Sequence, residues 1–270
     1  MSRSFHLHLI SDATGETAIA IARAACAQFD GAKCIEHLWS LVRTEAQLTR
    51  VLNNIEANPG VVFYSVVDAE LRNMLELSCR KANIPSVSLL DSAIKTLSIY
   101  LGEESVNQPG GQHVMDADYL KRIDAMNFAL AHDDGQGTLT MSGADVVLVG
   151  VSRTSKTPTC FYLANRGLKA ANVPFVHGCP LPKELLNLKG PLIVGLTRGA
   201  DQLVDIRKNR LAHLGEKQET DYVNPETVDN EVKEARRLFR KRNWAVLDVS
   251  RRSIEETAAA VLQLYDKQGQ

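Results

Sequence analysis

The residues best suited to catalysis in this chain lie in one short segment, residues 150–157, which reads Gly-Val-Ser-Arg-Thr-Ser-Lys-Thr. An apolar run precedes the segment and a helical pattern follows it. A nucleotide-binding P-loop places a glycine, four further residues and then Gly-Lys-Ser/Thr between a strand and a helix. Lys156 and Thr157 fit this pattern, and Ser155 stands where the second glycine is expected. The segment therefore predicts a phosphate-binding loop that differs from the usual pattern at one residue.

Each residue type in this loop suits a phosphorylated ligand. Backbone N–H groups of the loop and of the following helix favour an anion at one spot. Lys156 can reach terminal phosphates, Arg153 can bind phosphate through two hydrogen bonds, and the hydroxyl of Thr157 can ligate Mg²⁺. The predicted nucleotide-binding residues are Gly150, Val151, Ser152, Arg153, Thr154, Ser155, Lys156 and Thr157.

The alternative for this segment is a tight turn between a strand and a helix, with a solvated lysine. The strand–loop–helix context favours the nucleotide site over that alternative. The glycine that Ser155 replaces often takes a backbone conformation that serine tolerates poorly. We therefore expect either a loop of different shape or a loop that binds a different end of the nucleotide.

Two adjacent carboxylates, Asp133 and Asp134, precede the strand that leads into the loop and follow His132. Such carboxylates can supply a general base and a metal ligand. Asp-Asp-Gly is also an ordinary turn at the end of a helix. Because this segment runs directly into the domain that carries the phosphate loop, we favour a catalytic role for Asp133 or Asp134.

Further cations follow the loop in the sequence. Arg198 comes after an apolar run, and Arg207 and Arg210 are i, i+3 neighbours on the next predicted helix. Such groups stabilise charge in phosphoryl transfer, although a solvated helix face explains the helical pair equally well. Asp248, at the end of an apolar run, is a candidate magnesium ligand.

A second cluster of small and hydroxyl residues, Ser11–Thr17, follows the first apolar run. Its composition suits a second anion-binding site. N-capping of the next helix by Asp12 or Thr14 explains the same residues equally well.

Short apolar runs alternate with helical patterns, which predicts an α/β fold. We expect an N-terminal open parallel α/β sheet domain (1–112) and a C-terminal P-loop kinase-like α/β domain (113–270), with a linker within 102–114 because this stretch is rich in Gly and lacks periodicity. Strands are expected at 5–10, 35–42, 61–67, 85–90, 144–149, 172–176, 192–196 and 244–249. Helices are expected at 19–29, 45–57, 69–82, 92–101, 116–131, 156–167, 200–211, 225–241 and 253–265.

Composition narrows the function classes. The formal net charge is −1, but residues 1–149 carry 11 basic and 18 acidic side chains and residues 150–270 carry 20 basic and 14 acidic ones. These totals indicate neither a nucleic acid nor a membrane partner, while the basic half suits phosphorylated ligands. The five cysteines form no Cys-x-x-Cys pair, and no stretch is long and apolar enough to span a membrane. We expect a cytoplasmic protein with mostly buried, reduced thiols.

Together these segments resemble the bacterial and plant regulatory proteins of pyruvate, phosphate dikinase. The resemblance covers essentially the whole chain. A sister branch that regulates phosphoenolpyruvate synthase typically carries Cys-Gly where this chain has Thr154-Ser155, so the dikinase branch is favoured. The segments that carry the resemblance are Ile10–Gly15, Ala131–Gly135, Gly150–Pro158 and Ala171–Pro174.

The resemblance implies a bifunctional enzyme. Members phosphorylate an active-site threonine of the dikinase with ADP, which inactivates it, and remove the phosphoryl group with inorganic phosphate, releasing pyrophosphate. By resemblance, the loop 150–157 would bind ADP, Lys156 and Arg153 would act on the transferring group, and Thr157 would hold Mg²⁺. Asp133 or Asp134 would activate the target hydroxyl. The family also suggests a homodimer.

Three alternatives stay open at this point. The same chemistry could act on phosphoenolpyruvate synthase. The loop could belong to a small-molecule P-loop kinase that uses ATP. The chain could also be a non-enzymatic nucleotide-sensing module whose acidic half binds a partner protein.

Overall fold

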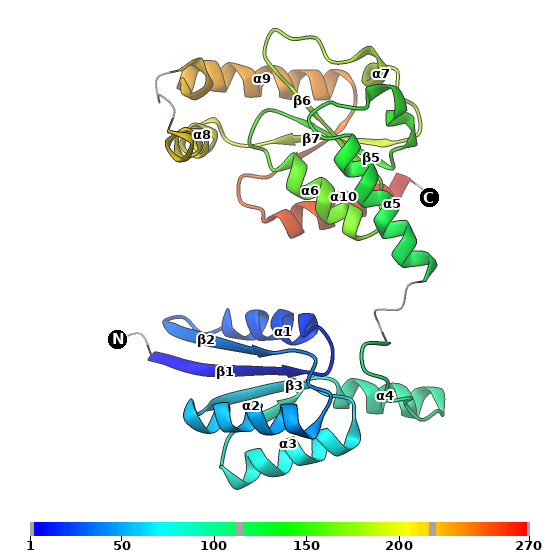
Figure 1. Ribbon diagram of the computed structural model, residues 1–270. Helices are drawn as coiled ribbons and strands as arrows, with labels where there is room; N and C mark the ends of the chain where they lie inside the picture. Colours follow the sequence, from blue (N-terminus) through cyan, green and yellow to red (C-terminus); the bar gives the residue numbers. More distant parts are fainter. Residues whose placement is uncertain (1–2, 112–115, 216–219, 269–270) are drawn as a thin grey trace. The chain divides into compact units, whose positions relative to one another are not determined.

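The computed structural model describes residues 3–111, 116–215 and 220–268. The chain divides into two compact units, residues 1–114 and 115–270. Each unit contains a four-stranded parallel sheet with helices around it (Figure 1), which confirms the predicted α/β class. The predicted boundary between residues 112 and 113 falls in the segment 112–115, outside the described residues.

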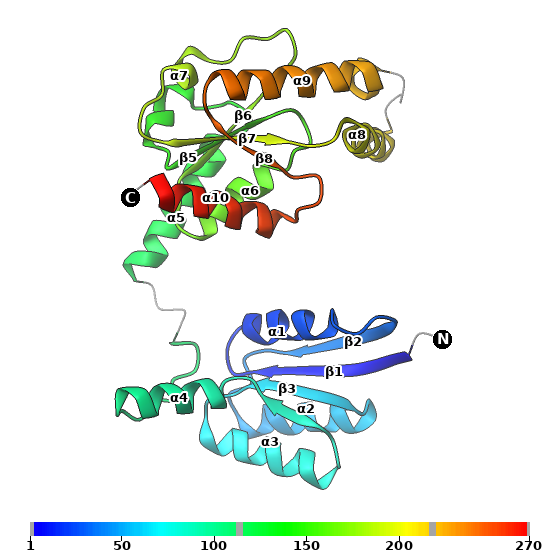
Figure 2. The ribbon, with the colours of Figure 1, turned by 180° about the vertical axis from the view of Figure 1, so that it is seen from behind.

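The first unit is a sheet of order β2-β1-β3-β4. α1 covers one face, where Leu7 and Leu9 of β1 pack with Ala18 and Ala22. α2 and α3 cover the other face, around Val62 (Figures 1 and 2). Its elements are β1 (Arg3–Ser11), α1 (Glu16–Cys26), β2 (Ala32–Trp39), α2 (Glu45–Ala57), β3 (Gly60–Ser65), α3 (Ala69–Lys81), β4 (Ser86–Ser88) and α4 (Asp91–Leu101).

The second unit is a sheet of order β6-β5-β7-β8. α6 and α10 cover one face, and α8 and α9 cover the other, so every residue of β5 is buried (Figure 2). Its elements are α5 (Ala117–Ala131), η2 (Thr138–Gly143), β5 (Val146–Gly150), α6 (Lys156–Asn165), β6 (Ala170–Pro174), α7 (Lys183–Leu186), β7 (Leu192–Thr197), α8 (Ala200–Leu214), η3 (Asp221–Val223), α9 (Pro225–Lys241), β8 (Ala245–Asp248) and α10 (Ile254–Gln268).

Both sheets have the same strand order when each is numbered along its own unit, namely 2-1-3-4. In such open parallel sheets, ligands bind outside the carboxyl ends of the strands, where the order reverses. That point lies between β1 and β3 in the first unit and between β5 and β7 in the second. The segments 11–17 and 150–157 begin at the last residues of β1 and β5, so each begins at the reversal point of its own sheet.

Several local expectations are wrong. α1 ends at Cys26, so Phe29 does not continue its apolar face and is 68% exposed. Only Cys79 and Cys160 are buried among the five cysteines, and Cys179 is exposed. η2, α7 and η3 were not predicted because each is too short to show a period. Within the described residues, no helix has the length and apolar character needed to cross a membrane.

Candidate functional site

The loop after β5 is packed tightly against the neighbouring strand. A Cβ atom at Gly150 would lie 2.6 Å from the carbonyl oxygen of Leu196 in β7 and 2.8 Å from Oγ1 of Thr154. Glycine is therefore needed at position 150 for steric reasons. Inside the loop, the hydroxyl of Thr154 is buried and donates to the carbonyl of Val151 at 2.9 Å. These contacts fix the loop on the end of the sheet.

Two loop residues have left-handed backbone conformations, Arg153 with φ 71° and Ser155 with φ 63°. Ser155 is the N-cap of α6, and its side chain makes no capping hydrogen bond within the described part of the chain. A non-glycine residue in this conformation is strained by about 1–2 kcal/mol. The start of α6 therefore keeps backbone N–H groups without a side-chain acceptor, which suits an anion.

Lys156 begins α6 and is only 6% exposed. Its Nζ donates to the carbonyl of Val151 at 3.1 Å and, among the described residues, forms no ion pair. Burial lowers the pKa of Lys156 to about 8, although Asp134 and other nearby acidic groups oppose the shift. A buried ammonium without a close counter-ion is unfavourable, so a bound phosphate would stabilise it.

Arg198 approaches the loop from the end of β7. Its guanidinium contacts Oγ of Ser155 at 3.5 Å and the carbonyl of Val249 at 3.2 Å. Its Nε is buried and lacks a protein hydrogen-bond partner within the described residues. Burial also lowers the pKa of Arg198, which nevertheless stays charged at neutral pH. The site thus holds a second cation with an unused donor.

The acidic pair before β5 meets the loop from the other side. The hydroxyl of Thr157 donates to Oδ1 of Asp133 at 2.9 Å, and the side-chain amide of Asn172 in β6 donates to the same oxygen. The Oδ1 of Asn172 accepts from the backbone N–H of Asp134 at 3.2 Å. Asn172 therefore holds the turn that carries both carboxylates. The side chain of Asp134 itself makes no hydrogen bond in the described structure.

A buried network supports the loop from behind. Arg207 in α8 is 2% exposed and pairs with Glu231 in α9 at 2.8 Å. The same guanidinium donates to the carbonyls of Ser152 and Tyr222, at 3.2 and 3.1 Å, and lies over the Tyr222 ring. The Tyr222 hydroxyl lies 3.0 Å from that of Ser152 and accepts from Nε of Arg153 at 3.3 Å. This network links two helices to the loop.

These groups surround a cavity of about 600 Å³, which lies within the usual range for sites that bind small molecules and cofactors. Three cations, Arg153, Lys156 and Arg198, line it with one carboxylate, Asp134. Its charge therefore favours a polyanion beside a group able to accept a proton. The lining residues are Asp134, Ser152, Arg153, Ser155, Lys156, Thr157, Pro158, Pro174, Val176, Arg198 and Ile206.

The structure separates some residues that the sequence grouped together. Arg207 is neither on a solvated helix face nor in the cavity lining, because its side chain is buried and bound to Glu231. Arg210 is exposed and does not line the cavity. Asp248 is bound to Arg236 at 3.2 Å and accepts from the N–H of Ser250, so it has partners other than a metal.

The cluster 11–17 lies in the other unit, where it lines a smaller cavity of about 150 Å³. Asp12 accepts there from the N–H of Val67 at 2.7 Å, which fixes the loop after β3. The acidic side chains of Asp12 and Glu16 line this cavity. Their charge makes it less suitable for an anion than the cavity beside Lys156.

Sequence reasoning assigned no role to Asn172 or Tyr222. Asn172 carried a usable signal, because it is a polar residue, 1% exposed, in the apolar strand Ala170–Pro174. Tyr222 carried none, because it lies in the three-residue η3 and meets the loop only through the tertiary fold.

The residues present fit a magnesium ion that is shared with a phosphate. Thr157 and Asp133 bring a hydroxyl and a carboxylate together, and these hard oxygen donors suit Mg²⁺. Among the described residues, there is no group of three or more His, Cys, Asp or Glu side chains that could hold a metal. Mg²⁺ commonly takes one or two protein oxygens and completes its shell with phosphate and water.

The family model and the individual relatives that match this chain all point to one protein family. The model of the kinase/pyrophosphorylase family matches residues 7–262. A protein of Paramagnetospirillum magneticum is 54% identical over 98% of this chain and 85% of its own length. Relatives from Caulobacter vibrioides and Maricaulis maris are 54% and 50% identical over 96% of this chain, and over 82% and 93% of their own lengths. All three carry the provisional name of pyruvate, phosphate dikinase regulatory protein.

Proposed function

Because the chain belongs to the kinase/pyrophosphorylase family, we propose that it regulates pyruvate, phosphate dikinase by reversible phosphorylation of a threonine. In the forward reaction ADP is the phosphoryl donor, and the dikinase is inactivated. In the reverse reaction inorganic phosphate takes the phosphoryl group, and pyrophosphate is released. The observation that most supports the proposal is the buried Lys156, which lines a cavity with two further cations and whose ammonium lacks a close counter-ion among the described residues.

In the forward step, the threonine oxygen attacks the β-phosphorus of ADP. The bond from that phosphorus to the bridging oxygen breaks, and AMP leaves with the bonding electrons. Lys156, Arg153 and Arg198 would stabilise the charge on the transferring group. Asp134 is the candidate base, because its carboxylate lines the cavity and makes no hydrogen bond among the described residues. It would take the hydroxyl proton and pass it to solvent.

In the reverse step, an oxygen of hydrogen phosphate attacks the phosphorus of phosphothreonine. The bond to the threonine oxygen breaks, and the proton of hydrogen phosphate ends on that oxygen, so the products are threonine and pyrophosphate. The attacking group is already anionic, so we expect its positioning by the cations to matter more than a base.

Thr157 and Asp133 would hold Mg²⁺ in this site. When bound, the ion would neutralise phosphate charge. Asn172 of β6 donates a hydrogen bond to Asp133 and so would help to keep this carboxylate in place for the ion.

The direct test is to incubate the chain with purified dikinase and either ADP or ATP. We expect phosphothreonine on the dikinase and AMP in solution with ADP, followed by pyrophosphate when phosphate is added to the modified dikinase. Mass spectrometry of the dikinase and loss of its activity provide two readouts. Transfer from ATP but not from ADP would contradict the proposal. Phosphoenolpyruvate synthase in a parallel reaction tests the other target.

Three single-residue variants test whether phosphoryl transfer takes place at this site. Lys156→Met should lose transfer in both directions. Asp134→Asn should slow forward transfer by roughly 10²–10⁴-fold and leave the Kd for ADP within about threefold. Asp133→Asn should instead raise the Mg²⁺ concentration needed for half-maximal transfer. If Asp134→Asn keeps the wild-type rate, the base lies elsewhere.

A further inference from the structure

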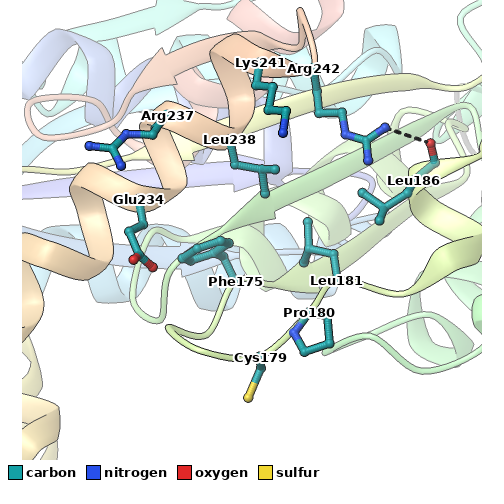
Figure 3. A pocket seen from close by; sticks show the side chains of 10 residues that line it. All are labelled: Phe175, Cys179, Pro180, Leu181, Leu186, Glu234, Arg237, Leu238, Lys241 and Arg242. Carbon is teal, nitrogen blue, oxygen red and sulfur yellow. Dashed lines mark hydrogen bonds between the residues drawn. The ribbon is translucent and has the colours of Figure 1, made fainter.

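A second cavity of about 410 Å³ lies on the second unit between α9 and the segment that follows β6 (Figure 3). We call it the α9 groove. Apolar side chains form much of its surface, and polar and charged side chains of α9 and of Arg242 complete it. Its lining residues are Phe175, Cys179, Pro180, Leu181, Leu186, Glu234, Arg237, Leu238, Lys241 and Arg242.

The charges around the α9 groove are unbalanced. Its one acidic residue, Glu234, already pairs with His177 at 2.6 Å. Arg242 donates to the carbonyl of Leu186 at 3.4 Å, a bond that leaves its charge without a counter-ion (Figure 3). Arg237 and Lys241 are exposed and make no hydrogen bond or ion pair within the described part of the chain. The groove therefore combines an apolar surface with three cations that have no acidic partner among the residues the structure describes.

The α9 groove adjoins the phosphate cavity through one short segment. Pro174 and Val176 line the phosphate cavity, whereas Phe175, between them in the chain, lines the groove. Alternate residues of an extended segment point to opposite sides, so one stretch of chain serves both cavities. A large molecule bound in the groove would thus lie near the site of phosphoryl transfer.

We propose that the α9 groove docks a segment of the protein substrate that carries an apolar side chain flanked by carboxylates. The inference rests on the proposed function, because it needs a protein substrate. The apolar side chain would pack on Phe175, Leu181 and Leu238, and the carboxylates would pair with Arg237 and Lys241. These contacts lie away from the reacting threonine. They would hold the dikinase in place while the hydroxyl of that threonine enters the phosphate cavity.

A charge-reversal pair tests the docking role. Arg237→Glu/Lys241→Glu should raise the KM for the dikinase by roughly tenfold or more, because it places like charges opposite the partner. The kcat and the Kd for ADP should stay within about twofold of wild type. The matched control is Lys208→Glu/Arg240→Glu, which makes the same charge change at exposed residues outside the groove. An unchanged KM, or an equal rise in the control, would overturn the proposal.

Cys179 provides a second readout because it is exposed and lines the α9 groove. We expect saturating dikinase to slow its modification by N-ethylmaleimide at least fivefold, measured on the Cys179 peptide. Arg237→Glu/Lys241→Glu should lose most of this protection at the same dikinase concentration. An unreactive Cys179 in the free chain would show that the chain itself covers the groove, and this too would overturn the proposal.

These outcomes also separate the docking proposal from the proposed function. If wild type transfers no phosphoryl group to the dikinase, the proposed function fails. If wild type transfers it and the groove variants keep its KM, only the docking proposal fails.

Discussion

At the scale of single residues, the buried ammonium of Lys156 makes nucleotide binding depend on pH. Its pKa is lowered to about 8 by burial, so the free chain loses this positive charge as the pH rises through 8. A phosphate binds the charged form better, which means that ADP affinity falls as the pH rises. We expect the Kd for ADP to increase roughly eightfold between pH 7.5 and 9.

Isothermal titration calorimetry at a series of pH values measures this effect. The control is Lys156→Met, which should bind ADP more weakly at every pH and show little change over the same interval. A flat profile for the wild-type chain would mean that Lys156 does not contact the bound phosphates.

Ser155 allows a test of backbone strain in the same loop. Its φ of 63° is easy for glycine and harder for a β-branched residue. Ser155→Gly should leave the free energy of unfolding within about 0.5 kcal/mol, because relief of strain offsets the greater freedom of the unfolded chain. Ser155→Val should lower it by roughly 1–2 kcal/mol. Urea denaturation measures the free energy of unfolding of both variants, with Ser155→Ala as the comparison. Equal stability of the Val and Gly variants would show that the loop can adopt another conformation.

The position of a candidate residue in the site was predictable only where it depends on local order along the chain. Lys156 and Thr157 follow a strand at a recognisable spacing, and both line the cavity beside the loop. Arg207 was not assignable in this way, because helical spacing makes it a neighbour of Arg210 but does not show which of them is buried. Its partner Glu231 lies 24 residues away in the chain and meets it only in the folded unit.

At the scale of elements, the Arg207–Glu231 pair joins α8 to α9 and supports the phosphate loop. Both side chains are almost buried, at 3% and 12% exposed, so removing one leaves a charge without compensation. We expect Glu231→Gln to lower the free energy of unfolding by about 3 kcal/mol. The double variant Arg207→Met/Glu231→Leu should lose less than that, because no buried charge remains.

Urea denaturation at equilibrium checks these values. Arg236→Ala is the matched control, since it removes an ion pair on α9 whose partners are 40% and 55% exposed, and it should cost less than 1 kcal/mol. A loss in Glu231→Gln as small as in this control would show that the buried pair does not stabilise the unit.

The first and last residues of a helix were predictable from the sequence where the capping residues and the apolar periodicity indicated the same bounds. α2 and α9 begin and end where predicted. Ser253 and Glu256 form a capping box before α10, because they exchange side-chain to backbone hydrogen bonds at 2.8 and 3.1 Å. The prediction for α1 was wrong at its end, because apolar spacing continued past Cys26 although the chain turns there.

At the scale of the whole molecule, the charge difference between the two units is smaller than that between the two halves of the sequence. The acidic stretch 115–149 belongs to the second unit, so the units carry net charges of −3 and +2. The two units have separate cores. Each unit has apolar clusters on both faces of its own sheet. The shared 2-1-3-4 order was not predictable, because the order of strands depends on how each connection crosses the sheet and not on the pattern within any strand. The likeness of the units therefore emerges only in their topology.

The two tryptophans allow the stability of each unit to be followed separately, because Trp39 lies in the first unit and Trp244 in the second. Trp39→Phe leaves Trp244 as the fluorescent reporter, and Trp244→Phe leaves Trp39. ADP at 100 times its Kd should stabilise the unit that binds it by about 2.7 kcal/mol. We therefore expect ADP to raise the melting temperature reported by Trp244 by several degrees and to leave that reported by Trp39 unchanged. Adding Lys156→Met to the Trp39→Phe chain should remove the shift, which ties it to the loop. Equal shifts at both tryptophans would show that the units unfold together, and a shift at Trp39 alone would place the nucleotide in the first unit.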